Sequence, residues 1–343
     1  MCAMRLRWIC VIVCSSVATC GVSRAQDMPI GVNERVRIAS GVSGHIHPAL
    51  CLTKKGTLVA IFSQADYKDL KIARSSDGGT TWSKPAAFPH TEKTAFYPGS
   101  LTTLGDGRLL HAWNVWFGYV GDNESKKKSR YVQYSLSDDD GVTWSAPKSL
   151  PKPANPAKES VVRHPIIELT PKQWLFSLMD KTVIYDVATG KVTDFGDGRN
   201  HGLVPIVRTP NGTLVSGAGL RSTDGGKSWT KIGPFPPITE QGWRHDLLVL
   251  SNGWLLASDV QGPGVGGDTF RFIVSRDDGQ SWNMEHPVVW YHPGRPIGGR
   301  ACPKTVELDA KTLGTLFYDT DAKQDGGSGV FFLRTPIARL NAN

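Results

Sequence analysis

A motif of eight residues that occurs four times is the feature of this sequence that most restricts its fold. Each copy reads Ser-x-Asp-x-Gly-x-x-Trp, and the copies span residues 75–82, 137–144, 222–229 and 275–282. In such a motif the Asp carboxylate accepts backbone N–H groups of a turn, the Gly takes a positive φ, and the Trp ring covers the turn from one side. Four such hairpin tips, in a chain with 37 glycines and 22 prolines, predict an all-β protein built from repeated units.

A second repeat marks where each unit begins. A residue pair that ends in Pro, or in Asp at one position, precedes an apolar strand, a polar turn and a second apolar strand. The six pairs are His47-Pro48, Tyr97-Pro98, His164-Pro165, Val204-Pro205, His245-Asp246 and Cys302-Pro303. Proline suits the first residue of a strand. The pairs are 40 to 67 residues apart, which is about the length that a four-stranded propeller blade needs.

The four motifs resemble the Asp-box, the repeat of bacterial neuraminidases, and the chain is similar to the sialidase superfamily over nearly its whole length. This resemblance implies a six-bladed β-propeller that forms one domain over residues 26–343. Four blades carry the Asp-box between their third and fourth strands, whereas the third blade has a plain hairpin that turns at residues 188–190. The sixth blade lacks an outer strand, and we expect residues 35–38 to supply it and to close the ring without an open edge.

Residues 1–25 have the character of a secretory signal peptide. Two arginines precede an apolar stretch, and Ser23-Arg24-Ala25 supplies the small residues of a cleavage site. The alternative is a lipoprotein signal at Cys20, to which the preceding Thr19 is a poor fit. We expect cleavage after Ala25 and an exported protein, periplasmic or extracellular, without a membrane-spanning segment.

Charge and cysteine content exclude other classes of function. Without residues 1–25 the 39 lysines and arginines fall by three, against 31 acidic residues, so the mature chain carries about +5. Nucleic-acid binding needs a concentrated basic stripe, and the one tight basic run, residues 126–128, is expected to be a solvated hairpin tip. Cys51 and Cys302 are too few for a disulfide scaffold, and their unequal depth in the blades argues against a bond between them.

The strand order places a site at one end of the ring axis. In each blade the first strand begins and the second strand ends on the same face, whereas the Asp-box hairpins lie on the other. Residues rich in Arg and His precede the first strands, and carboxylates follow the second strands, in loops held by a rigid ring. The substrate-binding candidates are Arg163, Arg244, Arg300, His47, Tyr97, His164, His201 and His245.

The three arginines are candidates for an anion clamp, because planar guanidinium groups bind carboxylates with two hydrogen bonds. The alternative for each arginine is an ion pair with a loop carboxylate. The histidines come from different blades and lack the tight spacing of metal ligands. We therefore expect them to hydrogen-bond around the channel mouth, and we expect no metal and no cofactor.

Hydrolysis of a glycoside requires an acid together with a nucleophile or a base. Asp66, Asp180 and Asp259 follow the second strands of blades 1, 3 and 5. Each could act as the general acid if burial raises its pKa, and Asp66 and Asp259 are the catalytic candidates. Tyr318 is the candidate nucleophile, and the alternative for it is a strand aromatic with a packing role.

Sialidases, as a family, use three arginines for the substrate carboxylate, an Asp acid, and a Tyr nucleophile paired with a Glu. The resemblance implies the acid at Asp66 and one of the three arginines at Arg244. Three positions depart from the family pattern. Residues 44–48 stand where the opening Phe/Tyr-Arg-Ile-Pro motif is expected, residues 199–202 lack the blade-4 Glu, and Cys302 replaces the blade-6 Tyr.

We therefore expect an exported, monomeric, sialidase-like glycoside hydrolase of the exo-α-sialidase type, acting on acidic or complex glycans. Two alternatives come from other classes of protein. A non-catalytic glycan-binding propeller would present exposed aromatic rings such as Trp116. An assembly scaffold would present an exposed apolar patch instead.

Overall fold

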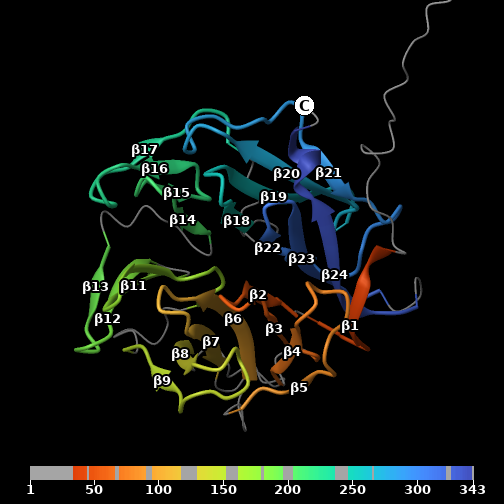
Figure 1. The fold of residues 1–343 in the computed structure, drawn as a ribbon, viewed down its shortest axis with the longest axis horizontal. Coiled ribbons are helices and arrows are strands. Elements are labelled where there is room, and N and C mark those ends of the chain that lie inside the picture. Colours follow the sequence, from red (N-terminus) through yellow and green to blue (C-terminus); the bar gives the residue numbers. More distant parts are fainter. Residues whose placement is uncertain are drawn as a thin grey trace, which may run out of the picture.

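The structure is a computed structural model, and it describes residues 34–44, 46–65, 69–89, 95–116, 130–151, 161–178, 181–195, 204–235, 246–264, 266–321 and 326–341. Within these ranges the chain forms 24 strands in six antiparallel four-stranded sheets, arranged as blades around a central axis (Figure 1). The predicted all-β, six-bladed propeller is therefore confirmed. No helix in the described part is long and apolar enough to cross a membrane.

The first three blades follow one another along the chain. Blade 1 contains β2(Ala49–Leu52), β3(Leu58–Phe62), β4(Lys71–Ser75) and β5(Ala86–Ala87). Blade 2 contains β6(Ala95–Thr103), β7(Leu109–Trp116), β8(Arg130–Ser137) and β9(Lys148–Ser149). Blade 3 contains β10(Ile167–Thr170), β11(Gln173–Ser177), β12(Thr182–Asp186) and β13(Val192–Asp194), with a plain hairpin between its last two strands.

The other three blades complete the ring. Blade 4 contains β14(Ile206–Arg208), β15(Leu214–Ser216), β16(Leu220–Ser222) and β17(Thr230–Lys231). Blade 5 contains β18(Asp246–Val249), β19(Leu255–Gln261), β20(Thr269–Ser275) and β21(Val288–Tyr291). Blade 6 contains β22(Lys304–Asp309), β23(Thr312–Asp319), β24(Gly329–Pro336) and β1(Val36–Ser40). The 3-10 helix η4(Ile337–Asn341) follows β24 in the chain.

The ring closes at blade 6, where strands from the two ends of the described chain meet. The outer strand β1 pairs antiparallel with β24, from Val36 opposite Phe332 to Ser40 opposite Gly329. The side chain of Arg37 donates from Nη1 to the carbonyls of residues 327 and 328, both at 3.0 Å. The Arg35 guanidinium lies 3.9 Å from the centroid of the Phe331 ring. These contacts hold β1 against β24 through side chains as well as through the strand ladder.

Each Asp-box hairpin is held by hydrogen bonds within its own eight residues. In the first box, Gly79 N donates to Ser75 Oγ (2.8 Å), Thr81 N donates to Asp77 Oδ1 (2.9 Å), and Trp82 Nε1 donates to the Gly79 carbonyl (3.2 Å). The boxes at Ser137 and Ser222 repeat all three bonds. The fourth box differs, because Trp282 Nε1 is buried without a hydrogen-bond partner and its ring packs edge-on to Phe235.

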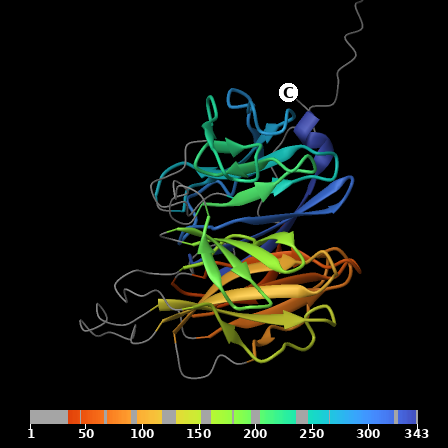
Figure 2. The ribbon, with the colours of Figure 1, turned by 90° about the vertical axis from the view of Figure 1, so that its left-hand side faces the viewer.

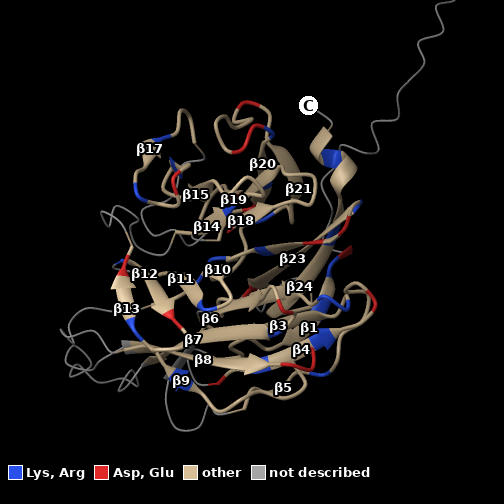
Figure 3. Cartoon of the chain, turned by 60° about the vertical axis from the view of Figure 1, so that its left-hand side comes forward, with Lys and Arg blue, Asp and Glu red and all other residues tan. Residues whose placement is uncertain are grey.

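The blades lie one against the next (Figure 2), and the hydrophobic core lies between neighbouring blades. Successive side chains of a strand point to opposite faces of the sheet, so an inner strand contributes to the cores on both sides of its blade. On β19, Leu255 packs toward blade 4 while Leu256 packs toward blade 6. Buried tryptophans such as Trp113 and Trp174 fill the wedge between blades. Figure 3 shows Lys and Arg interspersed with Asp and Glu on the turns and strand edges.

Candidate functional site at the axial end

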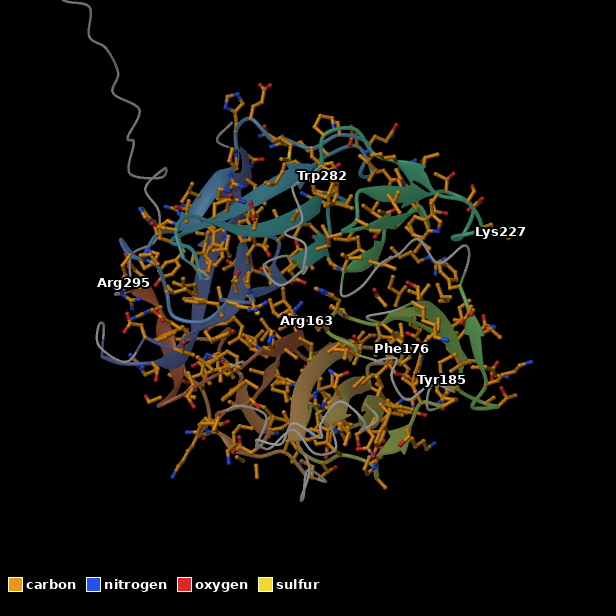
Figure 4. All side chains as sticks on the ribbon, turned by 180° about the vertical axis from the view of Figure 1, so that it is seen from behind. Arg163, Phe176, Tyr185, Lys227, Trp282 and Arg295 are labelled. Atoms are coloured by element: carbon orange, nitrogen blue, oxygen red, sulfur yellow. The ribbon has the colours of Figure 1, made fainter. Side chains whose placement is uncertain are left out.

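Six ionisable side chains from four blades meet at the end of the axis where the first strands begin. His47 precedes β2, Arg163 and His164 precede β10, and Asp246 opens β18. Cys302 precedes β22, and Lys304 is the first residue of β22. All six are buried, and Figure 4 shows Arg163 near the centre of the ring. We call this group the axial cluster.

The segment that carries Arg163 is fixed to blade 2. The side-chain amide of Asn114 on β7 donates to the Val162 carbonyl (2.8 Å) and accepts from Val162 N (2.7 Å). Two residues further on from His164, Ile166 N donates to Thr102 Oγ1 at 2.9 Å. The backbone on both sides of Arg163 is therefore held by blade 2, and the guanidinium reaches the axis from a defined position.

Arg163 contacts both His47 and Cys302. Its Nη2 lies 2.6 Å from His47 Nδ1 and 3.3 Å from Cys302 Sγ, and the sulfur lies 3.2 Å from the same His47 nitrogen. A guanidinium can only donate, so His47 Nδ1 accepts and the proton of the neutral imidazole is on Nε2. The guanidinium thereby fixes the tautomer of His47 and the orientation of its ring.

Backbone strain is concentrated at this contact. Five non-glycine residues in the described ranges have a positive φ, and three of them are His47 (41°), Ala301 (59°) and Cys302 (44°). The other two, Asp140 and Asp278, lie in Asp-box turns. Such conformations cost about 1 kcal/mol or more each and occur at sites where a side chain must be aimed. The strain here turns His47 and Cys302 toward Arg163.

A second set of contacts joins Lys304, His164 and Asp246. Lys304 Nζ donates to Asp246 Oδ1 and to His164 Nδ1, both at 3.1 Å, and Thr305 N donates to Asp246 Oδ2 at 3.0 Å. Burial lowers the pKa of His164 to about 3, with a further contribution from the Lys304 charge, so His164 is neutral. The cluster thus contains two cations, Arg163 and Lys304, and one carboxylate.

Burial also acts on the two charged partners. Burial lowers the pKa of Lys304, while the Asp246 carboxylate opposes this shift. Burial raises the pKa of Asp246, but the Lys304 ammonium and the hydrogen bonds to the carboxylate hold that pKa below its usual value. Each partner therefore keeps the other ionised inside the protein.

Tyr318 lies directly beside the axial cluster. Its ring centroid is 6.3 Å from that of His47, and its hydroxyl accepts a hydrogen bond from Arg300 N at 3.0 Å. Burial raises the pKa of Tyr318 well above its usual value, and the neighbouring Cys302 adds to the shift. The phenol is therefore protonated, and the contact of Arg300 with its hydroxyl is made by the backbone N–H.

Asp259 has different partners. It is fully buried on β19, opposite Arg271 on β20, and it forms an ion pair with that guanidinium. Its Oδ2 also accepts a hydrogen bond from Gln261 Nε2 at 2.8 Å. These contacts fasten the ends of β19 and β20 together, toward blade 4.

The structure brings together His47, Arg163, His164, Arg300 and Tyr318 from the residues that the sequence predicts. Asp66, Arg244, His201 and His245 lie outside the described residues, as does the side chain of Tyr97. Sequence reasoning missed Lys304 as a member of the site. Its signal is a lysine one residue after the Cys302-Pro303 pair, at the start of an inner strand. No group of three or more His, Cys, Asp and Glu in the described ranges is arranged to hold a metal ion.

Comparisons with known proteins agree with this architecture. The BNR/Asp-box repeat family model matches residues 220–231. A protein named Sialidase from Bacteroides fragilis is 28% identical over 211 residues, which are 53% of this chain and 34% of that protein. The chain thus spans about a third of the length of this relative.

Solved structures share the fold over almost the whole chain at low identity. A protein of unknown function from Dyadobacter fermentans has a TM-score of 0.66 at 19% identity, covering 88% of this chain and 97% of that one. A leech intramolecular trans-sialidase has a TM-score of 0.65 at 14% identity, covering 89% and 70%. The α-L-arabinanase of Penicillium chrysogenum has a TM-score of 0.59 at 15% identity, covering 89% and 98%.

Proposed function

We propose that this chain, a six-bladed Asp-box propeller of the sialidase superfamily, is an exported glycoside hydrolase that acts on an acidic glycan at the axial end of its ring. The observation that carries the proposal is the pair of buried cations in the axial cluster. Among the described residues of the cluster, the two cations Arg163 and Lys304 outnumber the one carboxylate, Asp246. A positive site with little water attracts an anionic substrate more strongly than an exposed one.

The chemistry of the cluster suggests a division of roles. Arg163 is suited to bind the substrate carboxylate, because its planar guanidinium can make two parallel hydrogen bonds. His47 and His164 are neutral and can exchange hydrogen bonds with sugar hydroxyls. Lys304 and Asp246 fix the position of His164. Asp66 as the general acid and Arg244 as a second arginine remain part of the proposal.

The relatives support the class of substrate. A Sialidase relative and the fold of a trans-sialidase support an α-sialoside as the first substrate to test. The shared fold of an arabinanase supports the broader class of glycoside hydrolases. An exo-α-sialidase is thus the specific form of the proposal.

A second candidate function is glycan binding without hydrolysis. It is favoured by Tyr318, whose phenol is buried, hydrogen-bonded to Arg300 N and raised in pKa. A phenol in this state is a poor nucleophile, and Cys302 stands where the family has its blade-6 Tyr. Turnover therefore distinguishes the two functions.

The test is release of fluorophore from an aryl α-sialoside and from an aryl β-glucuronide by the purified protein, with Arg163→Ala and Arg163→Lys. Removing the guanidinium should lower kcat/KM by about 10²–10³, as for the loss of one partner in a buried charge pair. Arg163→Lys should recover little, because an ammonium cannot bind a carboxylate with two bonds. Arg334→Ala, at an exposed arginine on β24, is the matched control and should not change kcat/KM.

Each result has a definite meaning. Turnover of the sialoside that collapses in Arg163→Ala supports a sialidase with its anion clamp in the axial cluster. Turnover of the glucuronide alone keeps the hydrolase and changes the sugar. Binding of acidic glycans without turnover favours the non-catalytic propeller. Turnover that is unaffected by Arg163→Ala would move the site away from the axial cluster.

A further inference from the structure

A groove on the opposite face of the ring lies between blades 4 and 5. It has a volume of about 540 Å³ and is built from the turn between β14 and β15, the turn between β18 and β19, and the Asp-box hairpin of blade 5. Its lining includes Asn211, Ser251, Asn252, Trp254, Arg276 and Gln280. We call it the blade 4/5 groove. The strand order separates it from the axial cluster, because these turns join the other ends of the inner strands.

An aromatic ring in a fixed position lies in the wall of the groove. Trp254 is half-buried, and the Arg276 guanidinium lies 4.6 Å from its ring centroid. Arg276 is itself held by a hydrogen bond of 2.7 Å from Nη2 to the Leu340 carbonyl of η4. Trp254 N donates to Asn252 Oδ1 at 3.0 Å, which fixes the turn before the ring. The indole and guanidinium are therefore held in place before any ligand arrives.

The polar groups of the groove carry little net charge. Asp277 accepts hydrogen bonds from Ser275 Oγ (2.8 Å) and Ser281 N (2.9 Å), and Arg276 lies next to it in the chain. Asp278 pairs with Arg221 at 2.9 Å. Asp278 is thus paired with a cation and Asp277 is held by its own hairpin, while exposed amides of Asn211 and Asn252 supply neutral donors and acceptors. This balance suits a neutral ligand rather than an anion.

The junction between blades 1 and 2 has the same turn, and side chains reach across it. Residues 53–57 and 209–213 form identical turns, in which the first and last residues are joined by an N–H to carbonyl bond of 2.8 Å. In blade 1 the turn carries Lys54 and Lys55, where blade 4 has Pro210 and Asn211. Lys54 Nζ donates to the Gly105 carbonyl of blade 2, and Lys55 Nζ lies 3.1 Å from Asp140 Oδ2.

The residue in the wall of the groove also differs between the two junctions. Arg108 of blade 2 occupies the position of Trp254 and pairs with Asp106 at 2.7 Å, and Asn252 stands at the position of Asp106. Two lysines that reach across one junction are thus replaced by short side chains at the other, and a paired arginine is replaced by an indole. The blade 4/5 groove therefore arises from side-chain differences on a backbone turn that both junctions share.

We propose that the blade 4/5 groove binds a neutral oligosaccharide. The apolar C–H face of a sugar ring packs against an aromatic side chain, and its hydroxyls pair with amide, hydroxyl and guanidinium groups, which are the groups that line this groove. A cavity of this size holds a small number of sugar rings. This site is distinct from the axial cluster and does not depend on the proposed catalysis.

The test is a glycan array of neutral and acidic oligosaccharides probed with the purified protein and three variants. The double variant P210K/N211K copies the lysines of blade 1 into the groove, and Trp254→Arg copies Arg108. Both substitutions use residues that the same turns already carry elsewhere in the chain, and a thermal unfolding curve checks that each variant folds. The third variant, Arg163→Ala, alters the axial cluster alone.

We expect the protein to bind neutral oligosaccharides and to lose at least tenfold in apparent affinity in both groove variants, while Arg163→Ala leaves this binding unchanged. The proposal is overturned by an absence of neutral glycan binding, by neutral binding that survives both groove variants, or by neutral binding that Arg163→Ala abolishes. If the protein has no hydrolase activity, each of these outcomes can still be distinguished, because the array measures binding only.

Discussion

The two ends of the propeller axis hold their charged groups in different ways. At the Asp-box end, Asp139 is bound by groups from its own hairpin, with Thr143 N at 2.8 Å and Ser137 Oγ at 2.9 Å. At the axial end, Asp246 is bound by Lys304 and Thr305, which lie 58 and 59 residues away in sequence and in another blade. The first arrangement is local and near the solvent, whereas the second is remote and buried.

This difference decides what each end can tolerate. A carboxylate at a hairpin tip keeps its contact with water, so the loss of a partner is softened by solvent. A carboxylate on the axis is buried away from water, so it depends on its charged partner to remain ionised there. Substitutions at the axial end should therefore act strongly and in a coupled manner, while those in the Asp-box hairpins should act through backbone geometry.

The largest expected effect is at Lys304. Lys304→Met leaves the Asp246 carboxylate buried beside a neutral imidazole, so the free energy of unfolding should fall by about 3–5 kcal/mol. Urea unfolding of Lys304→Met, Asp246→Asn and the double variant measures the coupling between the two residues. The double variant should be more stable than Lys304→Met, because it no longer buries an unpaired charge.

An exposed ion pair of the same type supplies the control. Lys181 and Asp194 lie 3.2 Å apart, with side chains 40% and 73% exposed, and Lys181→Met should change the free energy of unfolding by less than about 0.5 kcal/mol. If the losses in Lys304→Met and Asp246→Asn simply add in the double variant, Lys304 and Asp246 do not act as a buried pair.

The next effect separates two adjacent glycines in one Asp-box. Gly78 and Gly79 have φ of 68° and 87°, so an alanine at either position is strained by about 1 kcal/mol. A Cβ on Gly78 meets nothing within 4 Å, whereas a Cβ on Gly79 lies 2.1 Å from Cε1 of the buried Phe332 in blade 6. Gly79→Ala should therefore lower the free energy of unfolding by about 2–4 kcal/mol, and Gly78→Ala by about 1 kcal/mol.

Urea unfolding of the two alanine variants makes this comparison directly. Equal losses in the free energy of unfolding would mean that the cost comes from the local backbone conformation alone. The tip of the hairpin would then not pack against blade 6. The pair Gly225 and Gly226 repeats the test in blade 4, where a Cβ on Gly226 would lie 2.0 Å from Cζ of Phe195 in blade 3.

These contrasts explain which parts of the structure the sequence predicts. The Asp-box motif keeps its hydrogen bonds within eight residues, so four copies are enough to predict four hairpins, and the six residue pairs that precede the first strands predict six blades. The end of the axis at which site residues gather also follows from strand order. His47, Arg163 and His164 could be placed there without any knowledge of their partners.

The partners themselves could not be predicted, because they come from blades remote in sequence. The contact of Arg163 with His47 joins residues 116 apart, and that of Lys304 with His164 joins residues 140 apart. Lys304 was missed since a lysine at the start of a strand usually reaches solvent. Asp259 has the position of a candidate acid, but its partner Arg271 becomes visible only when the register of β19 and β20 is known.

The smallest effect concerns pH and tests the same contrast between the two ends. Burial lowers the pKa of His164 to about 3, whereas an unfolded His titrates near pH 6.5. As the pH falls below about 6.5 the unfolded state therefore binds a proton that the folded state refuses, and the protein loses stability until about pH 3. Replacing His164 by Gln should remove a loss of about 1 kcal/mol between pH 7.5 and 5.5, measured by urea unfolding at both values.

The contribution of the Asp-box carboxylates to stability should change at lower pH than that of His164. Burial raises the pKa of Asp139, but its several hydrogen bonds together outweigh this and lower the pKa to about 2. The contribution of Asp139 to stability is therefore present above the unfolded value near 4 and lost as the pH falls toward 2. Asp139→Asn should therefore leave the change between pH 7.5 and 5.5 intact, while His164→Gln reduces it. His111, whose pKa burial also lowers to about 3, keeps a residual slope in His164→Gln. An unchanged slope in His164→Gln would mean that the axial cluster accepts a proton at mild acidity, contrary to its buried, two-cation composition.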